Sequence, residues 1–264
     1  MKKRTGLFLL AAFALVGCSS YGNEISAEEF AVRKQNIQNE DADVADLNGY
    51  TYTLELKDPT ENFYSKVEAK YVKSTNDLML KTFVKSNDTC EGAAIYSVTK
   101  GDTYTFVTAS LDEKENVDKG TYFQIKSPLV STIASHISDI KNTRNSYVCS
   151  LKSDYVSIEK LDQAIENPQL FFEFENNNFE TSIKYYSKNQ KSLAVVYSAS
   201  ATNEQNQLCE FETIWAWENG YPIEASQKSI IDGNLTYEMS IKLSLKTPSI
   251  KLPDLSKLDK ETSL

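Results

Sequence analysis

Four cysteines and one histidine are the residues of this 264-residue sequence best suited to metal or nucleophilic chemistry. They are Cys18, Cys90, Cys149, Cys209 and His136. A zinc site usually takes ligands in close pairs, and no two of these cysteines form a Cys-x-x-Cys motif. A cysteine–histidine nucleophile pair would have no local signature here. We therefore expect no metal site, and we interpret His136 as a packing or surface residue.

A serine–lysine spacing is the next candidate for catalysis. Ser157 and Lys160 have the Ser-x-x-Lys spacing of penicillin-recognising enzymes. Those enzymes also need Ser-Asp-Asn and Lys-Thr-Gly elements downstream. Here Ser153-Asp154-Tyr155 lies upstream, and Lys246-Thr247 is followed by Pro248. We interpret Ser157 as a helix cap and expect no catalytic residue, no cofactor and no enzymatic activity.

Acidic side chains do not change this expectation. A calcium loop starting at Asp41 would need glycine at its sixth position and glutamate at its twelfth. The residues found there are Asp46 and Tyr52, so an acidic turn is the better interpretation. Glu210 and Glu212 share one face of a predicted strand, which is typical of a solvated face.

The N-terminus has the pattern of a secretory signal. Lys2, Lys3 and Arg4 precede an apolar run from Leu7 to Val16. This run is too short for a comfortable span of ~30 Å of hydrocarbon. Leu15-Val16-Gly17-Cys18 resembles the lipobox of bacterial lipoproteins. The resemblance implies cleavage after Gly17, acylation of Cys18 and a membrane-held protein whose domain lies outside the cytoplasm.

The charge balance excludes one class of partner. The chain has 28 basic and 37 acidic residues, and loss of residues 1–17 leaves 25 basic residues, a net charge of −12. An acidic surface is repelled by phosphate backbones, so we expect no nucleic acid partner. With Cys18 acylated, Cys90, Cys149 and Cys209 remain; either one pair is bridged or all three are buried thiols.

After a spacer at residues 18–25, the sequence predicts a helix, a first set of strands and a helical insertion. Ser26 and Glu29 form a capping box that starts a helix ending near Gln38. Alternating residues then predict strands between Gly49 and Lys126, beginning with Tyr50, Tyr52, Leu54 and Leu56 on one face. Helical spacing predicts an α-helical insertion near residues 128–166.

The second block of strands, up to residue 245, is more regular. Asp232-Gly233 is a strong hairpin signal, and the strand after it has an apolar face that includes Tyr237 and Met239. The sequence thus predicts one β-rich α+β domain at residues 26–253, in which a curved antiparallel sheet wraps a few short helices. We expect residues 254–264 to be a flexible tail.

This order of elements resembles the half-barrel lipoproteins of the LolA and LppX type. The match is clearest in Trp217-Glu218-Asn219-Gly220-Tyr221-Pro222, in Asp232-Gly233 and in the strand that ends at Lys246. In those families a curved sheet closes around helices and leaves a space for acyl chains. The resemblance implies the same for this chain.

We therefore expect a membrane-anchored lipoprotein that binds an apolar or amphipathic ligand between sheet and helices. The candidate ligand-binding residues are Trp215, Trp217, Tyr237, Met239, Ile133 and Ile137. For Trp215 and Trp217 we favour a position in the core over a position in a binding surface. The alternative function is a non-enzymatic surface lipoprotein with a filled core that binds an envelope or protein partner.

Overall fold

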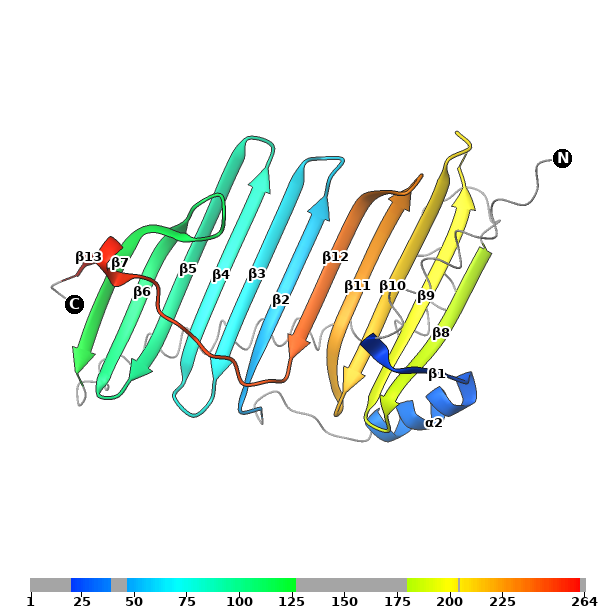
Figure 1. The fold of residues 1–264 in the computed structure, drawn as a ribbon, viewed down its shortest axis with the longest axis horizontal. Coiled ribbons are helices and arrows are strands. Elements are labelled where there is room, and N and C mark those ends of the chain that lie inside the picture. Colours follow the sequence, from blue (N-terminus) through cyan, green and yellow to red (C-terminus); the bar gives the residue numbers. More distant parts are fainter. Residues whose placement is uncertain (1–19, 39–46, 127–179, 204, 262–264) are drawn as a thin grey trace.

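The strands of this chain form one open, mostly antiparallel sheet in the computed structural model, which describes residues 20–38, 47–126, 180–203 and 205–261 (Figure 1). Thirteen strands hydrogen-bond in the order β1-β8-β9-β10-β11-β12-β2-β3-β4-β5-β6-β7-β13. The predicted β-rich class is confirmed. One complete α-helix, α2, lies within the described residues, and the expected insertion near 128–166 lies outside them.

Two runs of consecutive hairpins build most of the sheet. The first run contains β2 (Gly49–Asp58), β3 (Phe63–Val72), β4 (Asp77–Ser86), β5 (Thr89–Lys100), β6 (Thr103–Leu111) and β7 (Val117–Lys126). The second contains β8 (Glu180–Asn189), β9 (Ser192–Thr202), β10 (Leu208–Glu218), β11 (Tyr221–Ile231) and β12 (Asn234–Ser244).

The two runs join where β12 pairs with β2. Met239, Ile241 and Leu243 lie opposite Leu56, Leu54 and Tyr52. The hairpin before β12 turns at Asp232 and Gly233, which both have positive φ angles of 49° and 77°. Two successive positive φ values match the right-handed twist of the flanking strands, which is why Asp-Gly predicts this turn correctly.

Alternating residues give the sheet two faces, which we name by what packs on them. The helix face carries Tyr52, Trp215 and Ile241 and contacts α2 (Ala27–Gln38). The opposite strap face carries Met79 and Tyr96 and contacts a C-terminal strap, residues 247–258. The sheet therefore has hydrophobic clusters on both sides.

Helix α2 starts as its sequence predicts. The Ser26 hydroxyl accepts a hydrogen bond from the Glu29 backbone N–H at 3.1 Å, which satisfies one of the free N–H groups of the first turn. Phe30 and Ile37 are buried, and the Phe30 ring lies 4.7 Å from that of Tyr185 on β8. The helix thus covers the β8–β9 end of the helix face. Just before it, β1 (Asn23–Ile25) adds three residues to the edge of β8.

The expected flexible tail is wrong for residues 254–260. After β12 the chain crosses the strap face toward β7 (Figure 1), where η4 (Leu255–Lys257) and β13 (Asp259–Lys260) follow. Asp259 and Lys260 pair in parallel with Thr121 and Tyr122. Leu258 is buried among the hydrophobic side chains of β4–β6. Apolar contacts and a parallel edge pair therefore hold this segment in place.

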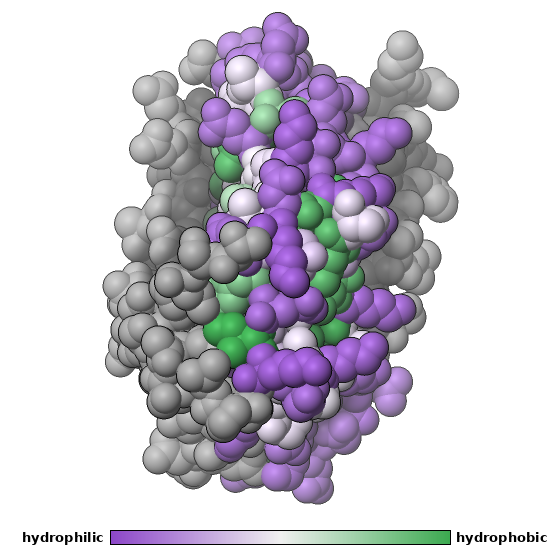
Figure 2. All heavy atoms as spheres, turned by 90° about the vertical axis from the view of Figure 1, so that its left-hand side faces the viewer, coloured by the Kyte–Doolittle hydropathy of each residue, from purple (hydrophilic) through white to green (hydrophobic). Residues whose placement is uncertain are grey.

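The far end of the sheet has its own small cluster. Tyr104 and Phe123 are buried there, and the Phe106 and Phe123 rings stack with centroids 5.3 Å apart. In the view onto this end, hydrophobic side chains gather in the middle with hydrophilic ones around them (Figure 2). Apolar packing therefore continues to the β7 edge.

Candidate functional site

The helix face is almost free of charge along most of the sheet. From β8 to β4, the alternating positions on this side carry no Asp, Glu, Lys or Arg except Asp58, the last residue of β2. On β12, for example, Tyr237, Met239 and Ile241 point to this side, while Glu238 and Lys242 point to the other. Such a surface suits apolar material and disfavours ions.

One part of the helix face is a packed core. Tyr52 and Leu243 are cross-strand neighbours and are almost fully buried. Trp217 joins the same cluster, which also includes Phe30 and Ile37 of α2. This cluster also contains Trp215 and has the character of a protein interior, in agreement with the core position expected for both tryptophans.

Two polar atoms on the helix face are buried without a hydrogen-bond partner among the described residues: the Tyr197 hydroxyl and the Trp215 indole Nε1. Tyr197 is 4% exposed and Trp215 is 8% exposed. An unsatisfied buried donor costs about 1–3 kcal/mol. Two such donors on one face therefore mark this part of the sheet as a candidate site.

The register makes the two residues diagonal neighbours, and their side chains belong to different hydrophobic clusters. Trp215 on β10 faces Val195 on β9, and Tyr197 lies two residues farther along β9, opposite Thr213. Diagonal neighbours of this kind lie within reach of aromatic side chains. Ile183, Ala199 and Phe211 pack around Tyr197. Burial raises the pKa of the Tyr197 hydroxyl, so at neutral pH this group is an uncharged donor.

The remaining predicted ligand residues are divided between described and undescribed parts of the chain. Tyr237 and Met239 are half-buried on the helix face, opposite Ser229 and Gln227 of β11. They therefore share the face with Trp215 and Trp217. Ile133, Ile137 and the predicted lipidation site Cys18 lie outside the described residues.

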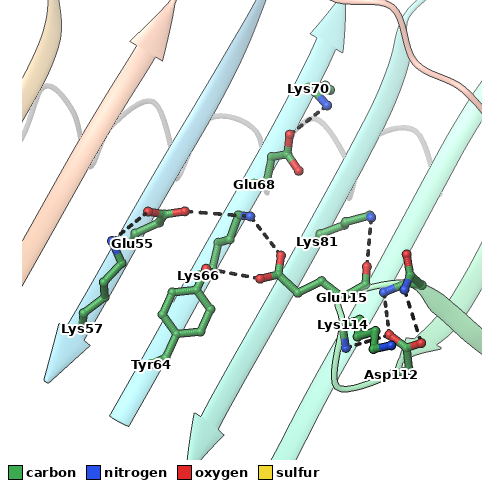
Figure 3. A network of polar contacts seen from close by, with 11 residues as sticks. Glu55, Lys57, Tyr64, Lys66, Glu68, Lys70, Lys81, Asp112, Lys114 and Glu115 are labelled. Carbon is green, nitrogen blue, oxygen red and sulfur yellow. Dashed lines mark hydrogen bonds and ion pairs between the residues drawn. The ribbon is translucent and has the colours of Figure 1, made fainter. Parts of the chain in front are cut away.

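Beside the apolar cluster under the strap, the strap face carries a network of ion pairs (Figure 3). Glu115, in the turn between β6 and β7, accepts hydrogen bonds from Lys66 Nζ at 2.9 Å and from the Tyr64 hydroxyl at 3.2 Å. Lys57 contacts Glu238 at 2.7 Å across the β12–β2 pair. Opposite charges already pair with one another here, which favours a solvated surface.

The same pairing explains the carboxylates that the sequence analysis singled out. Glu212 contacts Lys228 at 2.6 Å on the strap face, across the β10–β11 pair. Its neighbour on the chain, Thr213, points to the helix face. Glu212 is thus part of the charged side of the sheet, as its position in an alternating strand predicts.

Cysteine chemistry is limited in the part of the chain that the structure describes. Cys90 and Cys209 are both free thiols, the first half-buried and the second buried. Burial raises the pKa of Cys209, which makes it a poor nucleophile. Within residues 20–38, 47–126, 180–203 and 205–261, no three Cys, His, Asp or Glu side chains gather as a metal site would require. In those same ranges, no helix has the length and apolar character needed to span a bilayer.

Tyr197 is a site residue that the sequence does not single out, because several tyrosines on apolar strand faces fit either a core or a pocket lining. Its position in the run Leu193, Val195, Tyr197 places a polar hydroxyl among aliphatic residues on one strand face. That pattern is visible in the sequence, but a tyrosine hydroxyl usually finds a partner or reaches water. The three-dimensional structure shows that the Tyr197 hydroxyl is buried and has no hydrogen-bond partner among the described residues.

Comparisons with known proteins leave the family open. No protein-family model matches the chain, and no curated protein matches it. Among solved structures it is similar to a beta-barrel-like protein of a domain of unknown function, DUF1849, from Brucella abortus. The sequence identity is 10%, the match covers 75% of this chain and 96% of that chain, and the TM-score is 0.18. A likeness of this extent defines neither the family nor the function of this chain.

Proposed function

We propose that this chain is a lipid-anchored bacterial envelope lipoprotein that binds an apolar or amphipathic ligand on the helix face of a half-barrel-like sheet. The binding is non-covalent, and the protein has no catalytic role. The anchor is the acylated Cys18, and the domain lies outside the cytoplasm at the cell membrane or the outer membrane.

The observation that carries the proposal is the contrast between the two faces. The strap face pairs its own charges, as at Lys228 and Glu212, and needs no ligand to satisfy them. The helix face is almost uncharged, and it buries two donors, on Tyr197 and Trp215, for which no acceptor is found in the part of the chain that the structure describes. An apolar ligand that carries a polar group would cover the uncharged surface and accept hydrogen bonds from the two donors.

The experiment is native mass spectrometry of the protein expressed from its full-length sequence. Denaturation separates any non-covalent lipid from the covalently attached acyl groups, because only the latter stay on the Cys18 peptide. A lipid released on denaturation supports the proposal. A protein that carries no lipid and takes up no added fatty-acyl probe contradicts it.

A second candidate function is supported by the packed part of the helix face. Tyr52, Trp217 and Leu243 are buried there in one cluster, as in a protein with a filled core. On this view the chain is a surface lipoprotein that binds an envelope or protein partner. The mass spectrum separates the two candidates, because a filled core releases no lipid.

A further inference from the structure

We infer that the ligand presents an uncharged acceptor, an ester carbonyl between acyl chains, to the Tyr197 hydroxyl and the Trp215 indole. The inference rests on the proposed function and adds the chemical class of the ligand. It distinguishes neutral acyl esters from lipids that would bury a free carboxylate or phosphate at this position.

Tyr197 and Trp215 both carry hydrogen-bond donors. An indole Nε1–H can only donate a hydrogen bond, and a phenol that is uncharged donates readily. The group that satisfies both must therefore accept two hydrogen bonds. A carbonyl oxygen has two lone pairs and meets this requirement with a single atom.

The two donors come from adjacent strands on one face of the sheet. Val195 faces Trp215 and Thr213 faces Tyr197, so the two aromatic residues are diagonal neighbours on adjacent strands. Both polar atoms are buried, and neither has a partner among the described residues. A ligand held against this part of β9 and β10 would therefore need acceptors for two donors that lie on one face of adjacent strands.

The described surroundings of the two donors disfavour an anion. The helix-face neighbours of the pair on β8, β9 and β11 are Ile183, Ala199 and Gln227, none of which is charged. The nearby Lys228 lies on the strap face and contacts Glu212 at 2.6 Å. A buried carboxylate or phosphate with no cation beside it costs several kcal/mol, whereas an ester carbonyl has no such cost.

Apolar side chains lie farther along the same face. Met239, Leu54 and Leu56 are half-buried on the same face, on the strands beyond β11. Acyl chains attached to the ester can lie along these side chains. A neutral acylglycerol or a fatty-acyl ester combines both features in one molecule.

The test compares two fluorescent probes that share one pyrene-labelled acyl chain. One probe is a neutral diacylglycerol, and the other is the free fatty acid, which is ionised at pH 8. Both are titrated into the full-length protein after removal of bound lipid. We expect the diacylglycerol to bind at least about tenfold more tightly. We expect Tyr197→Phe and Trp215→Phe each to weaken its binding by about five- to thirtyfold, the effect of one lost hydrogen bond to a buried group.

A matched control and a gain-of-function variant sharpen the result. Tyr104→Phe removes a buried hydroxyl from the same face that already has a partner, Ser97, and should leave probe binding unchanged. Thr213→Lys places a cation opposite Tyr197 and should shift the preference toward the fatty acid.

The outcomes separate this inference from the function on which it rests. Equal binding of both probes, tighter binding of the fatty acid, or unchanged diacylglycerol binding in Tyr197→Phe and Trp215→Phe would overturn the neutral-ester inference and leave ligand binding intact. Absence of binding for both probes, together with a lipid-free native mass spectrum, would overturn the proposed function itself.

Discussion

Tyr197 and Trp215 are diagonal neighbours across the β9–β10 pair, and each buries a hydrogen-bond donor for which the described residues supply no acceptor. The same sheet face contains a tyrosine in the opposite situation. The Tyr104 hydroxyl lies 3.0 Å from the Ser97 hydroxyl, and both residues are buried. This contrast gives a direct way to test whether the Tyr197 hydroxyl serves stability or binding.

In ligand-free protein, Tyr197→Phe should raise the free energy of unfolding by about 0.5–1.5 kcal/mol, because it removes a desolvated hydroxyl that makes no hydrogen bond. Tyr104→Phe should lower it by about 1–2 kcal/mol, because Ser97 then loses its partner. Urea unfolding curves of the two variants measure the difference. Equal destabilisation by both changes would show that the Tyr197 hydroxyl already has a partner in the folded protein.

Alkaline pH should destabilise the fold through its buried tyrosines. Burial raises the pKa of Tyr197 above the value of about 10 that it has in the unfolded chain. The unfolded state therefore loses this proton first, so the free energy of unfolding is highest below about pH 10 and declines as the pH rises through the folded pKa. We expect Tyr197→Phe to lose less stability than the wild type between about pH 9 and 11. Thermal unfolding at each pH measures this, and identical slopes would contradict it.

The C-terminal strap should contribute measurably to stability. Leu258 is 8% exposed and packs with the hydrophobic cluster of the strap face. Leu258→Ala should cost about 2–4 kcal/mol through lost burial and the cavity left behind. Lys257→Ala, one residue earlier and exposed, should change stability by less than about 0.5 kcal/mol. A Leu258→Ala protein as stable as the wild type would mean that the strap is not held by these contacts.

The ion pairs around Glu115 should make a small contribution that depends on salt. Glu115→Gln weakens the contacts with Lys66 and Tyr64 and should lower the free energy of unfolding by about 0.5–1 kcal/mol at low ionic strength. The difference should narrow in high salt, because ions screen a partly exposed pair. Glu113→Gln in the same turn is the matched control. A loss that is independent of salt would indicate a packing effect rather than a charge effect.

Local patterns predicted most of the strands correctly. Alternation in the segment after Gly49 and hairpin residues such as Asp232 and Gly233 encode short-range structure directly. The capping box at Ser26 likewise predicted the start of α2. These features depend only on residues close together in the chain, which is why the sequence alone is sufficient for them.

The sequence could not predict the pairing of β12 with β2 or the ordered strap. No local pattern specifies which distant strand an edge will join, and the strap contains Pro248 and Pro253 with no helix or strand periodicity. Met79, Phe83 and Tyr96 point to the side opposite the main cluster, and this second apolar surface is what the strap covers. In the candidate site, alternation along the strand predicted the side of the sheet to which Trp215 points. Whether the Tyr197 hydroxyl has a hydrogen-bond partner depends on residues that are distant in sequence, so the sequence could not predict it.

The contact between β12 and β2 also has a consequence for how the chain reaches this structure. Each run of hairpins contains only pairs between strands adjacent in sequence, whereas Lys57 and Glu238, which meet at the join, are 181 positions apart. Bringing distant segments together costs more chain entropy than bringing neighbouring strands together. We therefore expect contacts within each run to form early and the β12–β2 pair to form late. Substitutions at the join, such as Ile241→Val, would then accelerate unfolding more than they slow folding.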